Sequence, residues 1–438
     1  MEHCRIHITS MDDEGRGRGT HLDAGGHSYE VAARGAFLGD DVLVRIERVF
    51  KAHHLKVGKA VKFYGQGDHH IERTCPHKGP CAACPLHGAS ESLAVQIKID
   101  RIEHALKTHN LDFALEPIIG TKKPFGFRQK VKLVASLQGE KLRLGVYVPH
   151  SHNFQGAESC PYVNARINEA IKEVLNHLNN GATRHDLLAI KAIIIRLGQE
   201  GPSIIIVSQD PLSEAVHTIM ANMVANHRLV SAIERLQPTD SNSLLGGTVV
   251  KAWGPTLIQS LEGGPDVDPD SFCQSDPEQA ACMYKLVAEY LTQDGIDGTF
   301  VDAYAGVGGF SRALLMQGCR HIVAIEQAQN ALVTLKQLGI DVLLKPMGQA
   351  IAELAHYSAL AGIVVDPPKK GLAQDAQAVA QLGALRLALV SCDPDAMARD
   401  LAVLIQHGYS VDRIIPMDFF AGTPNIEAVV LMRLMSDC

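Results

Sequence analysis

From about residue 263 to the C-terminus, segments typical of strands alternate with segments typical of helices. This alternation indicates a sheet of parallel strands, because parallel neighbours need a long connection that is usually a helix. The first helix is marked by SDPEQAACMYKLVAEYL, in which Asp276 can cap, Pro277 suits the first position and Gln279 completes a capping box. The preceding LEGGPDVDPDS is a linker rich in Pro, Gly and Asp. The sequence therefore predicts a C-terminal α/β domain.

The first strand of this domain leads into a glycine-rich turn. GTFVDAYAGVGGFSRALLMQG contains an apolar strand over 299–303, glycines at 306, 308 and 309, and then a helix. Glycines let the backbone approach a ligand and leave the helix N-terminus free for it. The next strand, HIVAIE, ends in Glu326, which can accept hydrogen bonds from ribose hydroxyls. The turn lacks the dinucleotide pattern and follows an acid, Asp302, so S-adenosylmethionine fits it better than a pyrophosphate.

Two later strands also end in chemically useful side chains. AGIVVDPPKKGL brings Asp366 to the end of an apolar strand, and LVSCDPDAMARD brings Cys392 to the end of the next. A cysteine in a core usually acts as a small hydrophobe. Ligands of open α/β sheets, however, bind at the carboxyl ends of the strands. Because these are successive strands, we expect Asp366 and Cys392 to face one crevice.

Length and composition limit the remaining possibilities. A chain of 438 residues is long enough for two or three domains, and 46% apolar with 20% charged residues is ordinary for a globular protein. The net charge of −7 provides no global basic field, so any nucleic-acid site must be a local basic face. No apolar run is long enough to span a membrane, and the N-terminus lacks the pattern of a signal peptide. A soluble cytoplasmic protein is expected.

Before the linker, the pattern favours β structure. Residues 1–63 contain strand-like stretches separated by glycine-rich turns, which fit a small barrel of oligonucleotide-binding type or another small β domain. Residues 92–110 predict an amphipathic helix, and 125–149 predict a hairpin. On its first strand, Arg128, Lys130 and Lys132 are two residues apart and share one face. They form either a solvated edge or a surface for a phosphate backbone.

Four cysteines suggest a metal centre. CPHKGPCAACPLHG gives a C-x5-C-x2-C array of Cys75, Cys81 and Cys84, and Cys160 in ESCPYVN is a distant fourth. Scattered cysteines of this kind are unlike a secreted disulfide framework. Four thiolates suit zinc or an iron–sulfur cluster, and a local zinc site of three cysteines with His77 or His87 also remains open.

Several motifs, in this order along the chain, resemble one known family. They are the cysteine cluster, FCQSD, VDAYAGVGGF, DPPKKG, SCDPDAMARD and DFFAGTPNIEAVVLM. The chain resembles the RNA uracil-C5 methyltransferases, which are class I S-adenosylmethionine-dependent enzymes, and in particular their 23S rRNA-type branch. This resemblance implies a Rossmann-like methyltransferase domain (92–124 and 263–438), an N-terminal OB-type TRAM barrel that binds RNA (1–63), and a central α+β iron–sulfur domain (64–91 and 125–262).

The resemblance also implies roles for individual residues. Cys392 would be the nucleophile and Glu427 the base that completes the reaction. S-adenosylmethionine would be contacted by Gln274, Tyr304, Gly309, Glu326 and Asp366. A four-iron, four-sulfur cluster of structural role would be held by Cys75, Cys81, Cys84 and Cys160. The RNA, 23S rRNA by this resemblance, would lie near Arg128, Lys130 and Lys132, and the protein would act as a monomer without an obligate protein partner or a membrane.

Three positions depart from the family pattern. Asp393 follows the nucleophile where the family most often has Asn, and Ala421 and Asn425 replace the common Pro and His near the base. A carboxylate beside Cys392 would oppose thiolate formation unless it points away or binds a cation. Two other interpretations remain: an amino-methyltransferase of the DPPY type, which needs no cysteine nucleophile, and an RNA-binding assembly factor with a vestigial cofactor pocket.

Overall fold

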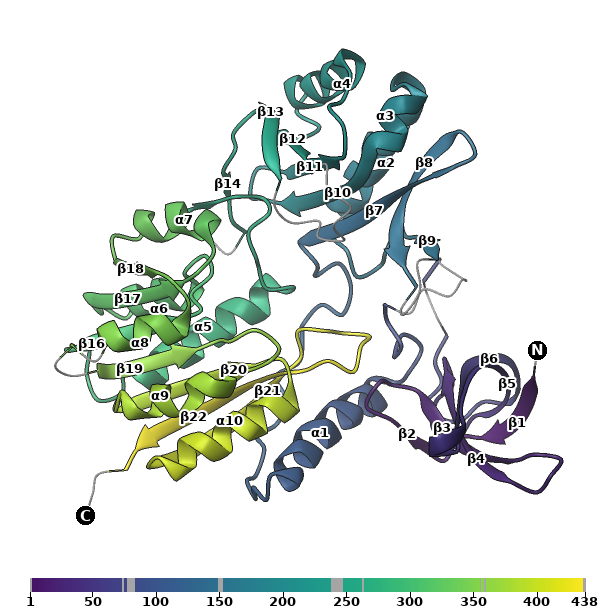
Figure 1. Cartoon of the computed structure of the whole chain (residues 1–438), viewed down its shortest axis with the longest axis horizontal. Helices are drawn as coiled ribbons and strands as arrows, with labels where there is room; N and C mark the ends of the chain where they lie inside the picture. The colour runs from purple at the N-terminus through teal and green to yellow at the C-terminus, as the bar shows by residue number, and fades with distance from the viewer. Residues whose placement is uncertain are drawn as a thin grey trace.

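Figure 1 shows the computed structural model of the chain, which describes residues 2–72, 75–76, 83–148, 153–237, 247–261, 264–354, 356–357 and 360–435. The chain forms three domains: a barrel-like N-terminal β domain, a central α+β domain and a C-terminal α/β domain. Among the described residues, no helix has the length and apolar character needed to cross a membrane.

The N-terminal domain is a curled six-stranded sheet. Its strands run in the order β1-β5-β6-β4-β3-β2, and alternate residues of β5, such as Val42, Val44 and Ile46, face a common core as the sequence predicted. The sheet is tight at Gly58, where an added Cβ would lie 2.2 Å from the carbonyl oxygen of Arg45 on the neighbouring strand. The strands are β1 (His3–His7), β2 (Ser10–Met11), β3 (Gly17–Leu22), β4 (Ser28–Arg34), β5 (Asp41–Phe50) and β6 (Leu55–Gly65).

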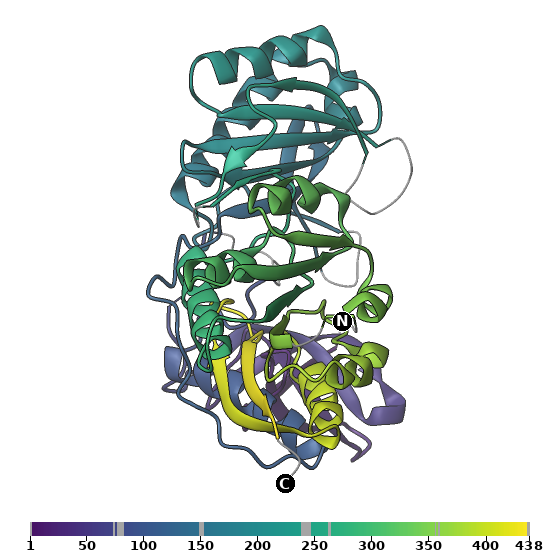
Figure 2. The same cartoon turned by 90° about the vertical axis from the view of Figure 1, so that its left-hand side faces the viewer.

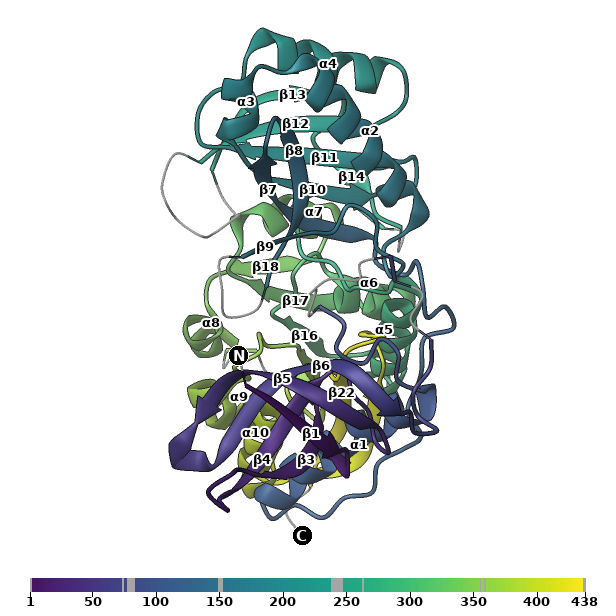
Figure 3. The ribbon, with the colours of Figure 1, turned by 90° about the vertical axis from the view of Figure 1, so that its right-hand side faces the viewer.

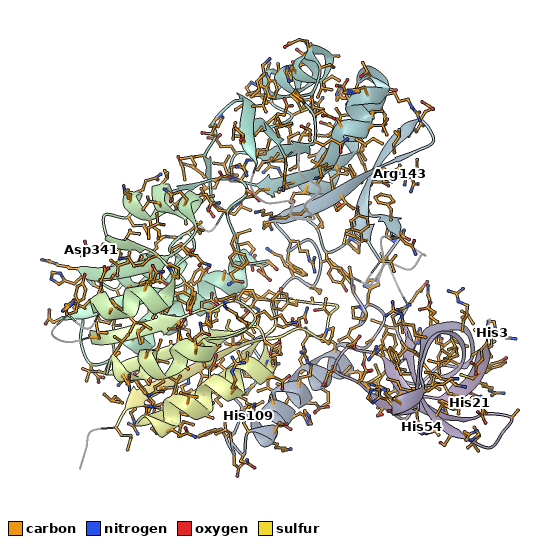
Figure 4. All side chains as sticks on the ribbon, viewed as in Figure 1. His3, His21, His54, His109, Arg143 and Asp341 are labelled. Carbon is orange, nitrogen blue, oxygen red and sulfur yellow. The ribbon has the colours of Figure 1, made fainter. Side chains whose placement is uncertain are left out.

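A single helix, α1 (Glu91–Thr108), connects this domain with the C-terminal one. The Ser90 side chain caps it by accepting a hydrogen bond from the backbone N–H of Leu93. Near its start, Leu93 and Ile97 pack with Phe37 of the N-terminal domain. Further along, Ile102 and other apolar residues join the core of the C-terminal domain. In Figure 4, the labelled His109 marks the residue directly after α1, and His54 lies on the barrel.

The central domain is a seven-stranded sheet of order β13-β12-β11-β10-β7-β8-β9, whose helices α2 and α4 pack on one face (Figure 3). Residues Ile193 and Ile195 of β10 point to this helix-covered core, whereas Ile194 points to the opposite face. The elements are β7 (Lys130–Gln138), β8 (Lys141–Tyr147), β9 (Phe154–Gly156), α2 (Ala165–Gly181), α3 (Arg184–Ala189), β10 (Ile190–Leu197), β11 (Pro202–Ser208), α4 (Glu214–Ala225), β12 (Ser231–Leu236) and β13 (Thr248–Trp253).

The C-terminal domain has a seven-stranded sheet of order β18-β17-β16-β19-β20-β22-β21. The first five strands in this order are parallel, as predicted, and β22 is antiparallel to both of its neighbours. Alternate strand residues point to opposite helix layers: Val301 packs in the core that includes α8, α9 and α10, and Phe300 in the core that includes α5 and α6. Figure 2 shows this domain below the central one.

The bounds of its elements are β14 (Ile258–Gln259), β15 (Asp266–Val267), α5 (Pro277–Leu291), β16 (Thr299–Ala303), α6 (Gly309–Met316), β17 (His321–Glu326), α7 (Leu332–Gln337), β18 (Asp341–Leu344), α8 (Met347–Leu354), β19 (Leu360–Val365), α9 (Ala376–Gln381), β20 (Arg386–Ser391), α10 (Pro394–Gln406), β21 (Tyr409–Met417) and β22 (Glu427–Leu434). Strand order reverses at β16, which has β17 on one side and β19 on the other. In open α/β sheets, a ligand crevice forms at such a switch point.

Candidate active site

The turn between β16 and α6 contains strained backbone. Tyr304 has a φ of 63°, and Gly306 and Gly308 have φ angles of 54° and 82°. Left-handed backbone is costly for tyrosine and concentrates at functional sites. A Cβ on Gly309 would lie 2.4 Å from the ring of Tyr284 on α5, so this glycine allows α6 to pack closely against α5. The turn is therefore fixed both by its backbone and by its packing.

Glu326 is held in a defined position at the end of β17. One of its carboxylate oxygens accepts a hydrogen bond from the backbone N–H of Gly306 at 2.8 Å, across the turn. The other accepts from the N–H groups of Gln327 and Ala328, both at 2.7 Å. The glycine-rich turn and the acid that the sequence paired with it are thus in direct contact.

Two more acids lie at adjacent strand ends. Asp302 of β16 is fully buried, and its Oδ2 accepts hydrogen bonds from the N–H and the hydroxyl of Ser311 at 2.8 and 2.6 Å. Its Oδ1 is buried and has no hydrogen-bond partner among the described residues. Burial raises the pKa of Asp302 to about 6. For Asp366, which follows β19, burial and the nearby Asp302 raise the pKa to about 7.

Cys392 and Glu427 are brought together by strand pairing. Ser391, the last residue of β20, is the register partner of Ala428 on antiparallel β22. Cys392, which follows Ser391, therefore lies opposite Glu427, which precedes Ala428. Cys392 is partly exposed, and Glu427 is buried. Burial, together with the charges of Glu427 and Asp366, raises the pKa of the Cys392 thiol to about 11. Burial, and then Asp366, raises the pKa of Glu427 well above its usual range.

Asp393, the first departure from the family pattern, is engaged elsewhere. Its Oδ1 caps α10 by accepting a hydrogen bond from the N–H of Ala396 at 3.0 Å. Its other carboxylate oxygen lies 3.9 Å from Nζ of Lys369. Among the charges that raise the pKa of Cys392, Asp393 acts less strongly than Glu427 or Asp366. The carboxylate therefore serves mainly as a helix cap.

The basic residues Lys130 and Lys132 of β7, and Arg128 just before it, lie at the junction with the C-terminal domain. A cavity of about 270 Å³ is lined by all three together with Asp270, Phe272 and Gln274. The ammonium group of Lys130 is engaged within the protein, because it donates hydrogen bonds to the carbonyl oxygens of Asp270 and Ser271. Burial lowers the pKa of Lys130 to about 8. The sequence did not reveal this role, since Asp270 lies 140 residues further along the chain.

Gln274 belongs to the segment that leads into α5. It is buried and lines the cavity at the domain junction, two residues before the cap of α5. Phe272, by contrast, has 70% of its surface exposed beside the same cavity. The FCQSD motif thus presents one aromatic side chain to the surface and one amide to the interior.

Three of the four cysteines expected to bind the cluster are described by the structure, and they line one cavity. Cys75, Cys84 and Cys160 all line one cavity of about 610 Å³, together with His87 and Tyr162. Cys81, the fourth proposed ligand, and His77 lie outside the described residues. Among the residues that are described, no three metal-ligating side chains are grouped closely enough to hold an ion.

Comparisons with known proteins place this site in context. Residues 349–435 match the model of the family described as tRNA (Uracil-5-)-methyltransferase. An uncharacterized RNA methyltransferase of Clostridium tetani is 27% identical over 457 residues, which cover 99% of this chain and 96% of that protein. Another, from Gloeobacter violaceus, is 27% identical over 91% of this chain and 90% of its own length.

One solved structure matches the whole architecture. The tRNA (uracil-54, C5)-methyltransferase of Pyrococcus abyssi, in complex with S-adenosyl-L-homocysteine, aligns with a TM-score of 0.74 at 19% identity. The alignment covers 98% of this chain and 100% of that one, so the two proteins share a fold. The family match, the full-length relatives and this shared fold confirm the resemblance that the ordered motifs indicated: the chain is similar to the RNA methyltransferases of the uracil-5 family.

Proposed function

We propose that the protein transfers a methyl group from S-adenosylmethionine to C5 of a uridine in RNA through a covalent intermediate on Cys392. The observation that carries the proposal is the pairing of β20 with β22, which sets a thiol and a buried carboxyl group opposite one another. A uracil-C5 transfer needs these two groups on one base. An amino-methyltransferase needs no such thiol.

The chemistry follows from the weakness of C5 as a nucleophile. Addition of the Cys392 thiolate to C6 of the uracil turns C5 into an enolate carbon that can attack an electrophilic methyl group. C5 then bears both the methyl group and its original hydrogen. Glu427 removes that proton, the C5–C6 double bond forms again, and the thiolate leaves. Reaching a base in this way requires that it be turned out of its stack into the pocket.

The carboxyl groups of the crevice fit a cationic donor. Among the described residues, no group donates a hydrogen bond to one buried oxygen of Asp302. Burial raises the pKa values of Asp302, Asp366 and Glu427, and no described cation offsets this rise. A bound cation would favour their ionised forms. S-adenosylmethionine carries a sulfonium and an ammonium group, and supplies the electrophilic methyl group when bound. By resemblance, Gln274, Tyr304, Gly309, Glu326 and Asp366 would hold it.

We further propose that the substrate is 23S rRNA, as the resemblance of the cysteine motif implies. The presence of the barrel does not indicate whether the substrate is ribosomal or transfer RNA, because the P. abyssi tRNA enzyme shares the full-length fold. Arg128 and Lys132 are the candidates for phosphate contacts, because both line the junction cavity and Lys132 is one-third exposed, although its Nζ lies 3.3 Å from a carboxylate oxygen of Asp270. Lys130 would act mainly by holding the linker at 270–271.

The four-iron, four-sulfur cluster is also a proposal. What supports it is that three of its four expected ligands, Cys75, Cys84 and Cys160, line the same cavity, while the described residues by themselves form no group that could hold a metal ion. The cluster would join the segment around residues 75–91 to the segment around Cys160. Uracil methylation needs no redox step, which favours a structural role.

The first prediction concerns the reactivity of the nucleophile. At pH 9, Glu427→Gln should raise the rate of Cys392 alkylation by about threefold to tenfold, because the amide removes a negative charge that raises the thiol pKa. The rate is measured with iodoacetamide by mass spectrometry of the peptide that contains residue 392. Alkylation of Cys282, exposed on α5, is the internal reference. An unchanged or slower rate at Cys392 would show that Glu427 places no negative charge beside the thiol at this pH.

The second prediction concerns the covalent intermediate. With S-adenosylmethionine and 23S rRNA that contains 5-fluorouridine, the wild-type protein should form an adduct that survives denaturation, because fluorine cannot be removed from C5 as a proton. Cys392→Ala should form none. Glu427→Gln should accumulate an adduct even with ordinary uridine, because proton removal fails. An adduct only with transfer RNA would overturn the choice of 23S rRNA, and no adduct with either RNA would overturn the mechanism.

The third prediction concerns the metal. Anaerobically purified protein should be brown and contain about four iron atoms per chain, with absorbance in the blue. Cys160→Ala should lose this iron, whereas Cys282→Ala, which changes an exposed cysteine on α5, should retain it. Colourless wild-type protein that contains zinc would contradict the assignment.

A further inference from the structure

The loop that leads into Glu427 is held by two other parts of the molecule. Residues 418–426, here called the base loop, connect β21 with β22, and Glu427 is the first residue of β22. Figure 1 shows this loop in yellow, extending from the sheet past the end of α1 toward the centre of the molecule. Strand pairing holds Glu427 and the residues that follow it, whereas the anchors of the base loop hold the chain that leads into Glu427.

The first anchor is α1. Lys98 is completely buried, and its Nζ lies 2.5 Å from Oδ1 of Asp418 and 3.3 Å from the carbonyl oxygen of Phe420. One turn further along the helix, Arg101 donates a hydrogen bond to the carbonyl oxygen of Pro424 at 2.5 Å. Burial lowers the pKa of Lys98, and Asp418 opposes that shift. A buried ammonium is stable only with such partners, so the base loop is tied firmly to α1.

The second anchor consists of the segment at Leu86 and His87, just after Cys84, and of Tyr162 in the central domain. The backbone N–H of Leu86 donates to the carbonyl oxygen of Gly422 at 3.0 Å. Gly422 has a φ of 77°, and a Cβ there would lie 2.1 Å from the hydroxyl oxygen of Tyr162. Tyr162 in turn is within 2.9 Å of Nδ1 of His87, whose Nε2 accepts a hydrogen bond from the N–H of Cys75.

Cys392 is positioned by different contacts. It follows β20 and precedes α10, where the hydroxyl of Ser391 and the carboxylate of Asp393 hold the local backbone. The ladder between β20 and β22 supports both residues, but the base loop leads only into Glu427. A disturbance of the base loop should displace Glu427 more than Cys392.

We propose that Lys98, Tyr162 and Gly422 are positioning residues for Glu427, and that they make proton removal from C5 depend on the docking of the central domain. This inference rests on the proposed function, because it assigns Glu427 the role of base. It predicts a specific kinetic defect. When the base loop is disturbed, thiolate addition and methyl transfer proceed, and the methylated adduct accumulates because its C5 proton is not removed.

The test uses two variants of the full-length protein. Gly422→Ala places a methyl group against Tyr162 in strained backbone. The double variant Lys98→Met/Asp418→Asn replaces the buried ion pair with neutral side chains of similar size, so that no isolated charge is left in the interior. It provides the test if Gly422→Ala does not fold. The matched control is Gly120→Ala. It lies beside Ile119, whose backbone pairs with the start of the base loop, and its added Cβ would have no neighbour within 4 Å.

The readout is a single turnover on RNA with ordinary uridine, with the denaturation-resistant adduct and the released methylated RNA followed separately. Each folded variant should form the adduct within about threefold of the wild-type rate and release product at least about tenfold more slowly. The control should match wild type. Variants that slow both steps equally, or that release product at the wild-type rate, would overturn the inference. If wild-type protein traps no 5-fluorouridine RNA, the proposed function itself fails instead.

Discussion

The antiparallel insertion of β22 between β20 and β21 is the constraint on which the site depends. A parallel strand at this place would bring its carboxyl end to the crevice, whereas the antiparallel strand brings its first residue, Glu427. The backbone ladder then fixes Glu427 opposite Cys392 without any side-chain contact. The thiol and the carboxyl group come from segments that are adjacent only through this pairing, and the helix cap at Asp393 turns the chain away immediately after the nucleophile.

Charge is the second constraint. Several strands end in acids at the same edge of the sheet, and burial raises the pKa values of Asp302, Asp366 and Glu427. Such a group of acids destabilises its own ionised forms in the absence of a cation. A cationic ligand would therefore change the protonation of the whole group and, with it, the charges that face Cys392. In the proposed mechanism, donor binding and the state of the Cys392 thiol are therefore coupled electrostatically.

Much of the C-terminal domain could be predicted from sequence because its signals are local. The apolar strands, the glycine turn, the Asp276 cap and Pro277 act within a few residues of one another, and the structure contains each of them. The predicted capping box is wrong, because Oε1 of Gln279 is buried and has no hydrogen-bond partner among the described residues. Contacts between distant segments could not be predicted in this way. The alternation of the strand predicts that Lys130 is a surface cation, yet its ammonium group donates hydrogen bonds to the carbonyl oxygens of Asp270 and Ser271. The Lys98–Asp418 pair likewise joins residues that no local pattern connects.

The most direct measurement is the release of tritium into water from 23S rRNA labelled at C5 of its uridines. Wild-type protein should release tritium only when S-adenosylmethionine is present, in proportion to the methyl groups transferred, because every turnover removes the C5 hydrogen. Cys392→Ala should release none. Methyl transfer to this RNA without tritium release would show that the methyl group goes to another atom, and the assignment of Cys392 and Glu427 would be wrong.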